Sequence, residues 1–363
     1  MNMAKWTKAK QPFVDKIKEA KRAEDFFIGL GVTKATQERM LKKRYQGMAK
    51  MVHPDHNPGV EEANLVLAAL NILHEEAERK IADGTFGKSL ATITFKDRKT
   101  SKTIEKIEPL TRGDIADLYT GRLDGKKVVL KIASDERDSD LIKNEATVLR
   151  KLAEAPDADH FMKYLPTLVD SIKLDGKQAN IFELVEGSHT LEKVLSLYPD
   201  GIEGRHVAWI WRRLLEVSIW AHLNGHLHMA IIPSNILVIP NNHGIKLLDW
   251  CYSGPLASTA KAIVPKYEEF FPPEARLKKI AKGGFDIFMI AKCVRSLIEG
   301  VEGAKKAGWS PRAPSYFTGM VAACLIPNPN MRYHLAQEVY DQLKKNVEKM
   351  YGPPKFIPFE LPA

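Results

Sequence analysis

The sequence contains little cysteine and no long apolar run. Its three cysteines, Cys251, Cys293 and Cys324, are odd in number and widely separated, which excludes a disulfide framework of the kind that small secreted domains use. No apolar stretch approaches the ~20 residues needed to cross a bilayer. The basic start, MNMAKWTKAKQPF, lacks the apolar segment of a secretory signal. We therefore expect a cytoplasmic protein with reduced thiols and no membrane partner.

Positive charge is concentrated at the front of the chain. Residues 1–51 hold 13 Lys and Arg against 5 Asp and Glu, so the remainder is close to neutral although the net charge is +9. A basic segment can bind nucleic acid or an acidic protein, but most charge runs are only solvated surface. Charge alone does not choose among these. The length and the 44% apolar content are typical of a globular protein of two or three domains.

Two amphipathic helices are predicted within residues 23–87. Apolar residues recur there at the spacing of one helix face in each of two segments. In the first segment they are Leu41, Tyr45, Met48 and Val52. In the second they are Ala63, Val66, Leu67, Leu70 and Leu73. The intervening HPDHNPG has two prolines and a glycine, which forbid a continuous helix, so the pattern predicts two antiparallel helices joined by an exposed loop.

Two motifs accompany this helical pair. DFFIGLGV, at Asp25–Val32, is similar to the Asp-Tyr-Tyr-x-x-Leu-Gly-Val opening of the J domain of DnaJ-type co-chaperones, and HPDHNPG is similar to that family's His-Pro-Asp-x-Asn-x-Gly loop. Residues 23–87 thus resemble a J domain, preceded by a basic arm over residues 1–22. The family's fourth helix and Gly/Phe-rich segment are not recognisable after Lys80, so a client would be held elsewhere in the chain.

The J-domain resemblance implies a partner. A rigid tip and a basic helix face would dock on a DnaK-type chaperone and stimulate its ATP hydrolysis, with electrostatic steering by the basic face. The residues expected to do so are His53, Pro54, Asp55, Lys42, Lys43 and Arg44. The ordinary alternative for the tip is a turn with an Asx cap.

The chain from residue 88 to 350 begins with strand patterns and continues with helical ones. Short runs of alternating polarity are typical of antiparallel strands, and a hairpin is predicted at Asp124-Gly125. A helix is predicted over Leu141–Leu152 and strands around Ile172–Val185, with mostly helices to the end.

Several short motifs follow one another in this region. They are VVLKIA, KNEATVLRKL, IFELVEG, HMAIIPSN, LLDWC, FPPEA and CLIPNPNMR. Their order and spacing resemble those of protein kinases, which implies a bilobal fold with an N-lobe over 88–186 and a C-lobe over 187–350. The whole chain is expected to be a multi-domain α+β protein, in which a small all-α J domain precedes the kinase-like fold and a C-terminal tail covers 351–363.

The kinase resemblance implies a site for ATP and Mg²⁺. Lys131 would hold phosphate and Glu145 would pair with it, while Asn235 and Asp249 would hold the metal. The full nucleotide-binding set would be Gly113, Lys131, Glu145, Glu183, Val185, Asn235 and Asp249. Taken singly, these residues also have ordinary interpretations, such as a surface ion pair or a turn cap.

Three further residues would stabilise the large lobe. Glu274 and Arg332 match the two members of the family's buried ion pair, and Asp286 matches its lobe-organising aspartate.

The catalytic loop departs from the family. Ala230 stands where the general base belongs and Ile232 where a lysine contacts the transferred phosphate. Loss of a general base typically costs ~10²–10⁴-fold in rate. The phosphate-covering loop keeps only Gly113, with Asp114 and Asp117 adding negative charge, and Cys251 replaces a glycine.

These departures predict a pseudokinase. The leading hypothesis is a J-domain co-chaperone whose kinase-like scaffold holds an unknown protein client. The alternative is an active Ser/Thr protein kinase with an atypical catalytic loop. A small-molecule phosphotransferase of the aminoglycoside type is less favoured because those enzymes also use the loop aspartate, and we do not expect nucleic acid to be a partner.

Overall fold

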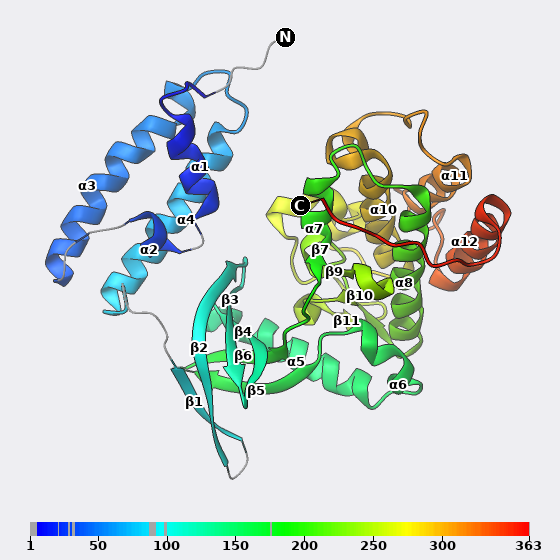
Figure 1. Ribbon diagram of the computed structural model, residues 1–363, viewed down its shortest axis with the longest axis horizontal. Helices are drawn as coiled ribbons and strands as arrows, with labels where there is room; N and C mark the ends of the chain where they lie inside the picture. Colours follow the sequence, from blue (N-terminus) through cyan, green and yellow to red (C-terminus); the bar gives the residue numbers. More distant parts are fainter. Residues whose placement is uncertain are drawn as a thin grey trace. The chain divides into compact units, whose positions relative to one another are not determined.

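The computed structural model describes residues 6–20, 22–27, 30, 33–86, 92–97, 100–174 and 176–362. The chain divides into two compact units. The first comprises residues up to 113 together with 117–127, and the second comprises 114–116 together with 128–363. Helices occupy the front of the chain and a mixture of strands and helices follows, which confirms the predicted order of an all-α part and an α+β part (Figure 1).

The helices of the first unit include the predicted pair. They are α1 (Gln11–Glu19), α2 (Ala23–Phe26), α3 (Lys34–Val52) and α4 (Ala63–Ala82). Helices α3 and α4 lie side by side and run in opposite directions (Figure 1). Leu41 and Val52 of α3 are buried, as are Val66 and Leu70 of α4, so the two predicted apolar faces form a common core.

Helix α1 is a feature that the sequence pattern did not predict. It lies within the stretch expected as a basic arm, and its Val14 and Ile17 are buried in the same core as the helical pair. The side chain of Trp6 is buried there too. Phe26 and Phe27 of the DFFIGLGV motif also enter this core, whereas its residues 28–29 and 31–32 lie outside the described residues.

Three antiparallel strands complete the first unit. They are β1 (Thr92–Asp97), β2 (Thr100–Arg112) and β3 (Ala116–Leu123). Ile104 pairs with Ile93 on one side and Leu123 on the other. The predicted turn at Asp124-Gly125 follows β3. Both of its residues have positive φ, 50° and 78°, which is the backbone of a tight two-residue hairpin.

The second unit begins with strands and a helix that carry much of the candidate site. Strands β4 (Lys126–Ala133), β6 (Lys177–Glu183) and β5 (Leu168–Leu174) pair antiparallel in that order. Helix α5 (Ser139–Ala153) packs against β6. Its apolar stripe, including Ile142, Leu149 and Leu152, is buried, as the sequence pattern predicted.

The rest of the second unit is largely helical. Its helices are α6 (Ala158–Phe161), α7 (Leu191–Leu197), α8 (Gly204–Leu223), α9 (Pro273–Arg276), α10 (Gly283–Lys305), α11 (Ser315–Cys324) and α12 (Ala336–Tyr351). Its short strands are β7 (His189–Thr190), β8 (His226–Leu227), β9 (Ile236–Ile239), β10 (Gly244–Leu247) and β11 (Gly254–Pro255). Helix α8 packs against α10 and α12 in the core. In the described part of the chain, no helix combines the length and apolarity needed to cross a membrane.

The segment after α12 returns to the surface of α8. Phe359 is buried, with its ring centroid 4.6 Å from that of His206 and 5.9 Å from that of Tyr198. His243 Nε2 lies 2.7 Å from the carbonyl oxygen of Ile357. The expected tail therefore has a defined seat of aromatic and histidine side chains.

Candidate functional site

The loop after α3 presents a polar tip. His53 ends α3, and Pro54 begins a single 3₁₀ turn over Pro54–His56. The backbone N–H of Asp55 donates to His53 Nδ1 over 3.2 Å. The side chain of Asp55 is 83% exposed and that of His53 is 43% exposed. The proline and this hydrogen bond stiffen the turn, so both side chains are held at the surface.

Asn57 anchors this tip from below. Its side chain is buried and donates to the carbonyl oxygens of Met51, over 3.0 Å, and His53, over 2.8 Å. The ammonium of Lys10 donates to Asn57 Oδ1 over 2.6 Å. The sequence motif included Asn57 without assigning it a role. Its position in HPDHNPG was the available signal, because asparagine commonly bonds nearby backbone in turns.

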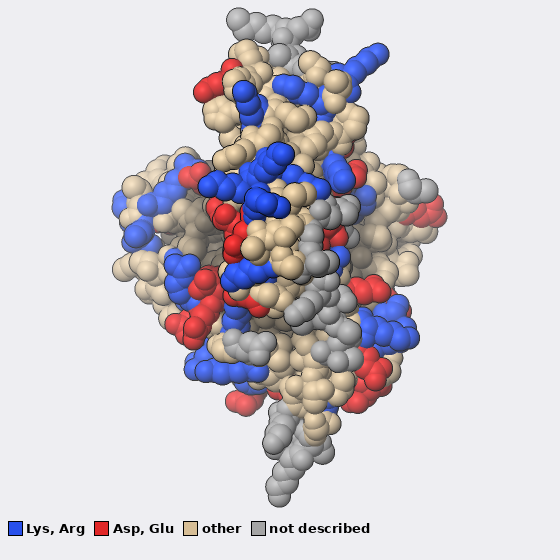
Figure 2. Space-filling model, turned by 90° about the vertical axis from the view of Figure 1, so that its left-hand side faces the viewer, with Lys and Arg blue, Asp and Glu red and all other residues tan. Residues whose placement is uncertain are grey.

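Basic side chains lie on the surface of α3. Lys42 and Lys43 are exposed and Arg44 is half-buried. Seen from the side that carries α3 in Figure 1, several lysine and arginine side chains gather close together (Figure 2). The structure therefore exposes the tip together with Lys42 and Lys43, and leaves Arg44 partly accessible.

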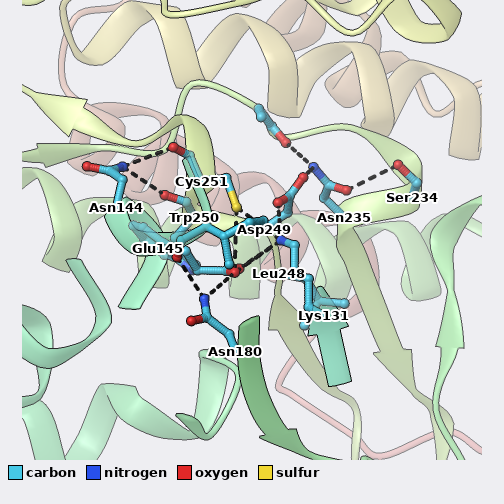
Figure 3. Close-up of polar contacts among 12 residues, drawn as sticks. Lys131, Asn144, Glu145, Asn180, Ser234, Asn235, Leu248, Asp249, Trp250 and Cys251 are labelled. Atoms are coloured by element: carbon cyan, nitrogen blue, oxygen red, sulfur yellow. Dashed lines mark hydrogen bonds and ion pairs between the residues drawn. The ribbon is translucent and has the colours of Figure 1, made fainter. Parts of the chain in front are cut away.

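A second cluster surrounds the ammonium of Lys131 (Figure 3). Lys131 on β4 donates to Glu145 Oε1 on α5 over 3.1 Å, and it forms a short ion pair with Asp249 Oδ1. The thiol sulfur of Cys251 lies 3.1 Å from the same nitrogen. The predicted pairing of Lys131 with Glu145 is present, and Asp249 joins it.

Two asparagines that sequence reasoning missed position this cluster. Asn180, in the middle of buried strand β6, donates to Glu145 Oε2 over 3.1 Å and to the carbonyl of Ile142 over 2.8 Å. Asn144 donates to the carbonyl of Cys251 over 2.9 Å (Figure 3). The one sequence signal for Asn180 was a polar side chain between apolar neighbours in β6, because a polar group buried there needs a hydrogen-bond partner.

The pKa values follow from burial and charge. Burial opposes the charge on Lys131, but its three partners outweigh it and hold the pKa of the ammonium well above its usual value. Burial also opposes ionisation of Asp249, but Lys131 outweighs it and keeps this pKa low. For Glu145, burial outweighs Lys131 and raises the pKa. Burial raises the pKa of Cys251 well above that of a free thiol, so it stays protonated at neutral pH.

This cluster also has the residue types of a metal site. In the described part of the chain, Glu145, Asp249 and Cys251 have potential ligand atoms that all lie within 4.8 Å of one another. The ammonium of Lys131 contacts all three. A resident cation is therefore already present, and a metal among these three atoms would have to displace it.

Asn235 and Asp249, the predicted metal pair, are neighbours. Asn235 Nδ2 lies 3.2 Å from Asp249 Oδ2 and 3.1 Å from the carbonyl of Ala230, while Asn235 Oδ1 accepts from Ser234 Oγ over 3.2 Å. Carboxylate and amide oxygens are ligand types that Mg²⁺ accepts. The donor set fits a magnesium ion that is also held by phosphate.

The loop around Ala230 is packed tightly. Ala230 and Ile232 are buried, and as apolar side chains neither offers an ionisable group. Asp286 on α10 accepts the backbone N–H groups of His228 and Met229 over 2.8 and 2.9 Å, and its Oδ2 lies 2.9 Å from His222 Nε2. Asp286 therefore fixes the loop, in agreement with its expected organising role.

The remaining residues of the expected nucleotide-binding set lie outside the Lys131 cluster. The amide of Glu183 donates to the carbonyl of Thr167 over 3.0 Å, and the carbonyl of Val185 accepts from Ser188 Oγ over 2.6 Å. Gly113 belongs to the first unit, whereas the cluster around Lys131 belongs to the second.

The predicted ion pair of the large lobe is present. Glu274 and Arg332 form a short, buried ion pair.

Comparison with known proteins separates the two parts of the chain. Residues 25–83 match the DnaJ domain model. The mitochondrial chaperone protein dnaJ GFA2 of Arabidopsis thaliana is 40% identical over 65 residues, which cover 17% of this chain and 14% of that protein. Serine/threonine-protein kinase F of Synechocystis sp. is 28% identical over 218 residues, which cover 55% of this chain and 43% of that protein. The chain spans less than half the length of either relative. A J domain at residues 25–83 is therefore joined here to a region similar to a serine/threonine kinase.

Proposed function

We propose that this chain is a cytoplasmic co-chaperone that stimulates a DnaK-type chaperone through its J domain and presents to it a protein held by the kinase-like region. The observation that carries the proposal is the exposed His53–Asp55 tip, held by the buried side chain of Asn57. A tip fixed before binding loses little conformational entropy on docking, and the basic face of α3 steers an acidic partner toward it.

The test is the ATPase rate of a purified DnaK-type chaperone with and without the full chain. We expect stimulation by the native chain and its loss in His53→Gln. His56→Gln is a matched control, because His56 is exposed in the same turn but is not one of the three tip residues expected to dock on the chaperone. Absence of stimulation by the native chain, or full stimulation by His53→Gln, would exclude this function.

For the kinase-like region we propose a bilobal kinase fold without phosphotransfer activity. The buried Ala230 and Ile232 support this, because no proton acceptor or cation stands at either position. Phosphoryl transfer depends on positioning and on neutralising charge, and a catalytic cation and a base are both missing from the loop. We expect no transfer of labelled phosphate to the chain itself or to generic protein acceptors.

The same region is proposed to bind ATP with Mg²⁺. Bound nucleotide would supply triphosphate oxygens that complete the coordination of the metal. Asn235 and Asp249 would contribute the protein ligands, and Lys131 would turn from Asp249 toward phosphate. The test is the melting temperature of the full chain with and without Mg-ATP, because a ligand that binds only the folded state stabilises it. A rise that Asp249→Ala abolishes supports the site; no rise at millimolar ATP excludes it.

A second candidate is an active Ser/Thr protein kinase. The Lys131–Glu145 contact and the adjacent Asn235–Asp249 pair favour it, since these groups orient phosphate and metal in the family that the sequence resembles. Transfer of labelled phosphate that Asp249→Ala abolishes would establish this candidate and overturn the pseudokinase proposal.

A further inference from the structure

A basic cavity opens in the second unit, apart from the tip and from the Lys131 cluster. Its volume is about 410 Å³, within the range of about 300–1,000 Å³ that ligand pockets occupy. It lies between the segment that joins α9 to α10 and the segment before α12. The polar residues that line it include Lys278, Lys279, Lys282, Asn330 and His334. We call this cavity the lysine pocket.

The charge of the lysine pocket is not balanced from within. Lys278, Lys279 and Lys282 are exposed, and among the residues that the structure describes no carboxylate lies within 4 Å of their ammonium groups. Glu274, the acidic residue of the lining, is already paired with Arg332. Three like charges around one cavity produce a positive potential that an anionic ligand would relieve.

Next to the lining, the buried ion pair of Glu274 and Arg332 leaves polar atoms without protein partners. Among the described residues, Arg332 Nε and Nη1 and Glu274 Oε2 have none. Gly284 lines the pocket, and a Cβ added there would lie 3.5 Å from Arg332 Nε and 2.8 Å from the carbonyl of Tyr333. A side chain at Gly284 would therefore crowd the backbone of Tyr333 at the edge of the pocket. These atoms are buried and the Arg332 side chain has no exposed surface, so a ligand in the pocket would contact the exposed lysines and not this ion pair.

The lysines stand on a segment that is held in place. Ala281 N donates to the carbonyl of Ser258 over 2.8 Å, and Ala257 N donates to the carbonyl of Ala281 over 3.1 Å. Lys279 N donates to the carbonyl of Glu274 over 2.9 Å. A segment fixed in this way presents its charges with little loss of entropy on binding.

Apolar groups accompany the lysines. Leu277 is 61% exposed and Ile280, which lines the pocket, is 59% exposed. The aromatic residue of the lining, Phe285, is buried. Single-stranded nucleic acids are usually bound by exposed aromatic side chains along a basic groove. Exposed aliphatic side chains beside lysines instead fit a polypeptide.

We propose that the lysine pocket binds an acidic segment of a polypeptide chain. Its carboxylates pair with Lys278, Lys279 and Lys282, and its aliphatic side chains contact Leu277 and Ile280. This site would hold the client of the co-chaperone, and in that respect it rests on the function proposed above.

The test uses the full chain and a fluorescein-labelled peptide of ten residues that alternates Glu and Leu, with binding followed by fluorescence anisotropy. Replacing all three lysines, as Lys278→Gln/Lys279→Gln/Lys282→Gln, should weaken binding about tenfold or more, because three charge contacts are lost. The matched control removes three exposed lysines elsewhere in the same unit, Lys173→Gln/Lys344→Gln/Lys345→Gln, and should bind within about twofold of the native chain.

Equal weakening in both triple variants would overturn the proposal, because it would report net charge alone. Equal binding of a Lys/Leu peptide, or tighter binding of a single-stranded oligonucleotide of the same charge, would overturn it too. Chaperone stimulation is measured on the same samples. Stimulation without peptide binding would disprove only the proposal for the lysine pocket. Specific peptide binding without stimulation would disprove only the co-chaperone function.

Discussion

The ammonium of Lys131 lies 3.1 Å from the thiol sulfur of Cys251. Cys251 occupies the position at which the kinase resemblance leads one to expect a glycine. The same nitrogen pairs with Glu145 and Asp249. A thiol thus stands in the cluster for which we propose nucleotide binding, and three groups of the protein already contact the ammonium of Lys131. The stability of the second unit should depend on this arrangement.

Loss of Lys131 should destabilise the fold. Lys131→Met leaves the carboxylates of Glu145 and Asp249 without their cation, and breaking a buried ion pair typically costs about 3–5 kcal/mol. The measurement is the free energy of unfolding in urea. The double variant Lys131→Met/Glu145→Gln should recover part of the loss, whereas Lys173→Met, at an exposed lysine, should change little. A native-like free energy for Lys131→Met would contradict the contacts described.

Substitutions in the tip of the J domain and in the residue that anchors it should have different effects on function and on stability. Asp55→Asn should abolish stimulation of the chaperone ATPase with almost no change in stability, because Asp55 is exposed. Asn57→Ala removes two hydrogen bonds to the loop backbone and should destabilise the J domain by about 1–3 kcal/mol. Thermal unfolding and ATPase stimulation of both variants provide the check. If Asp55→Asn is the more destabilising of the two, the assignment of anchor and tip is wrong.

The C-terminal segment should make stability depend on pH. Burial lowers the pKa of His206 and of His243 in the folded chain, so the unfolded chain takes up protons first as pH falls below about 6.5. Their contribution is present above that pH and is lost progressively below it. A chain that ends at Gly352 lacks Phe359, whose ring packs on His206, so this imidazole is less buried and the chain should lose less unfolding free energy between pH 7 and 5. If the unfolding free energies of the two chains change equally between pH 7 and 5, the C-terminal segment does not contribute to the burial of these histidines.

Charge near the proposed nucleotide site should limit affinity. Partial burial, with a further contribution from Asp249, raises the pKa of Asp114, which indicates that two acidic groups share this region of the second unit. Asp114→Asn should strengthen Mg-ATP binding by about two- to fivefold, the scale of an exposed charge interaction. Isothermal titration calorimetry of the full chain measures this, with Asp140→Asn on the exposed face of α5 as control. Weaker binding by Asp114→Asn would place its carboxylate on the metal instead.

Much of the local structure could be predicted from the sequence. The apolar spacing of Leu41, Val52, Val66 and Leu70 predicted the helical pair, because burial of one helix face depends on residues three and four positions apart. The hairpin at Asp124 was equally local. Helix α1 was not predicted within the basic arm, because its two buried residues gain stability in a core that includes α4, a helix about fifty residues further along the chain.

By itself, the sequence determined which chemical groups are present: the His53-Pro54-Asp55 tip, the lysine and carboxylates of the kinase-like region, and alanine in place of a base. Tertiary structure decided which of them meet. Lys131 contacts Asp249 across 118 residues of chain, and the lysine pocket combines residues near 280 with others near 330. Periodicity records local geometry, whereas contacts between distant residues arise only when the whole chain packs. Tertiary packing therefore decided which partner each charged group has, and with it the chemistry that the group can perform.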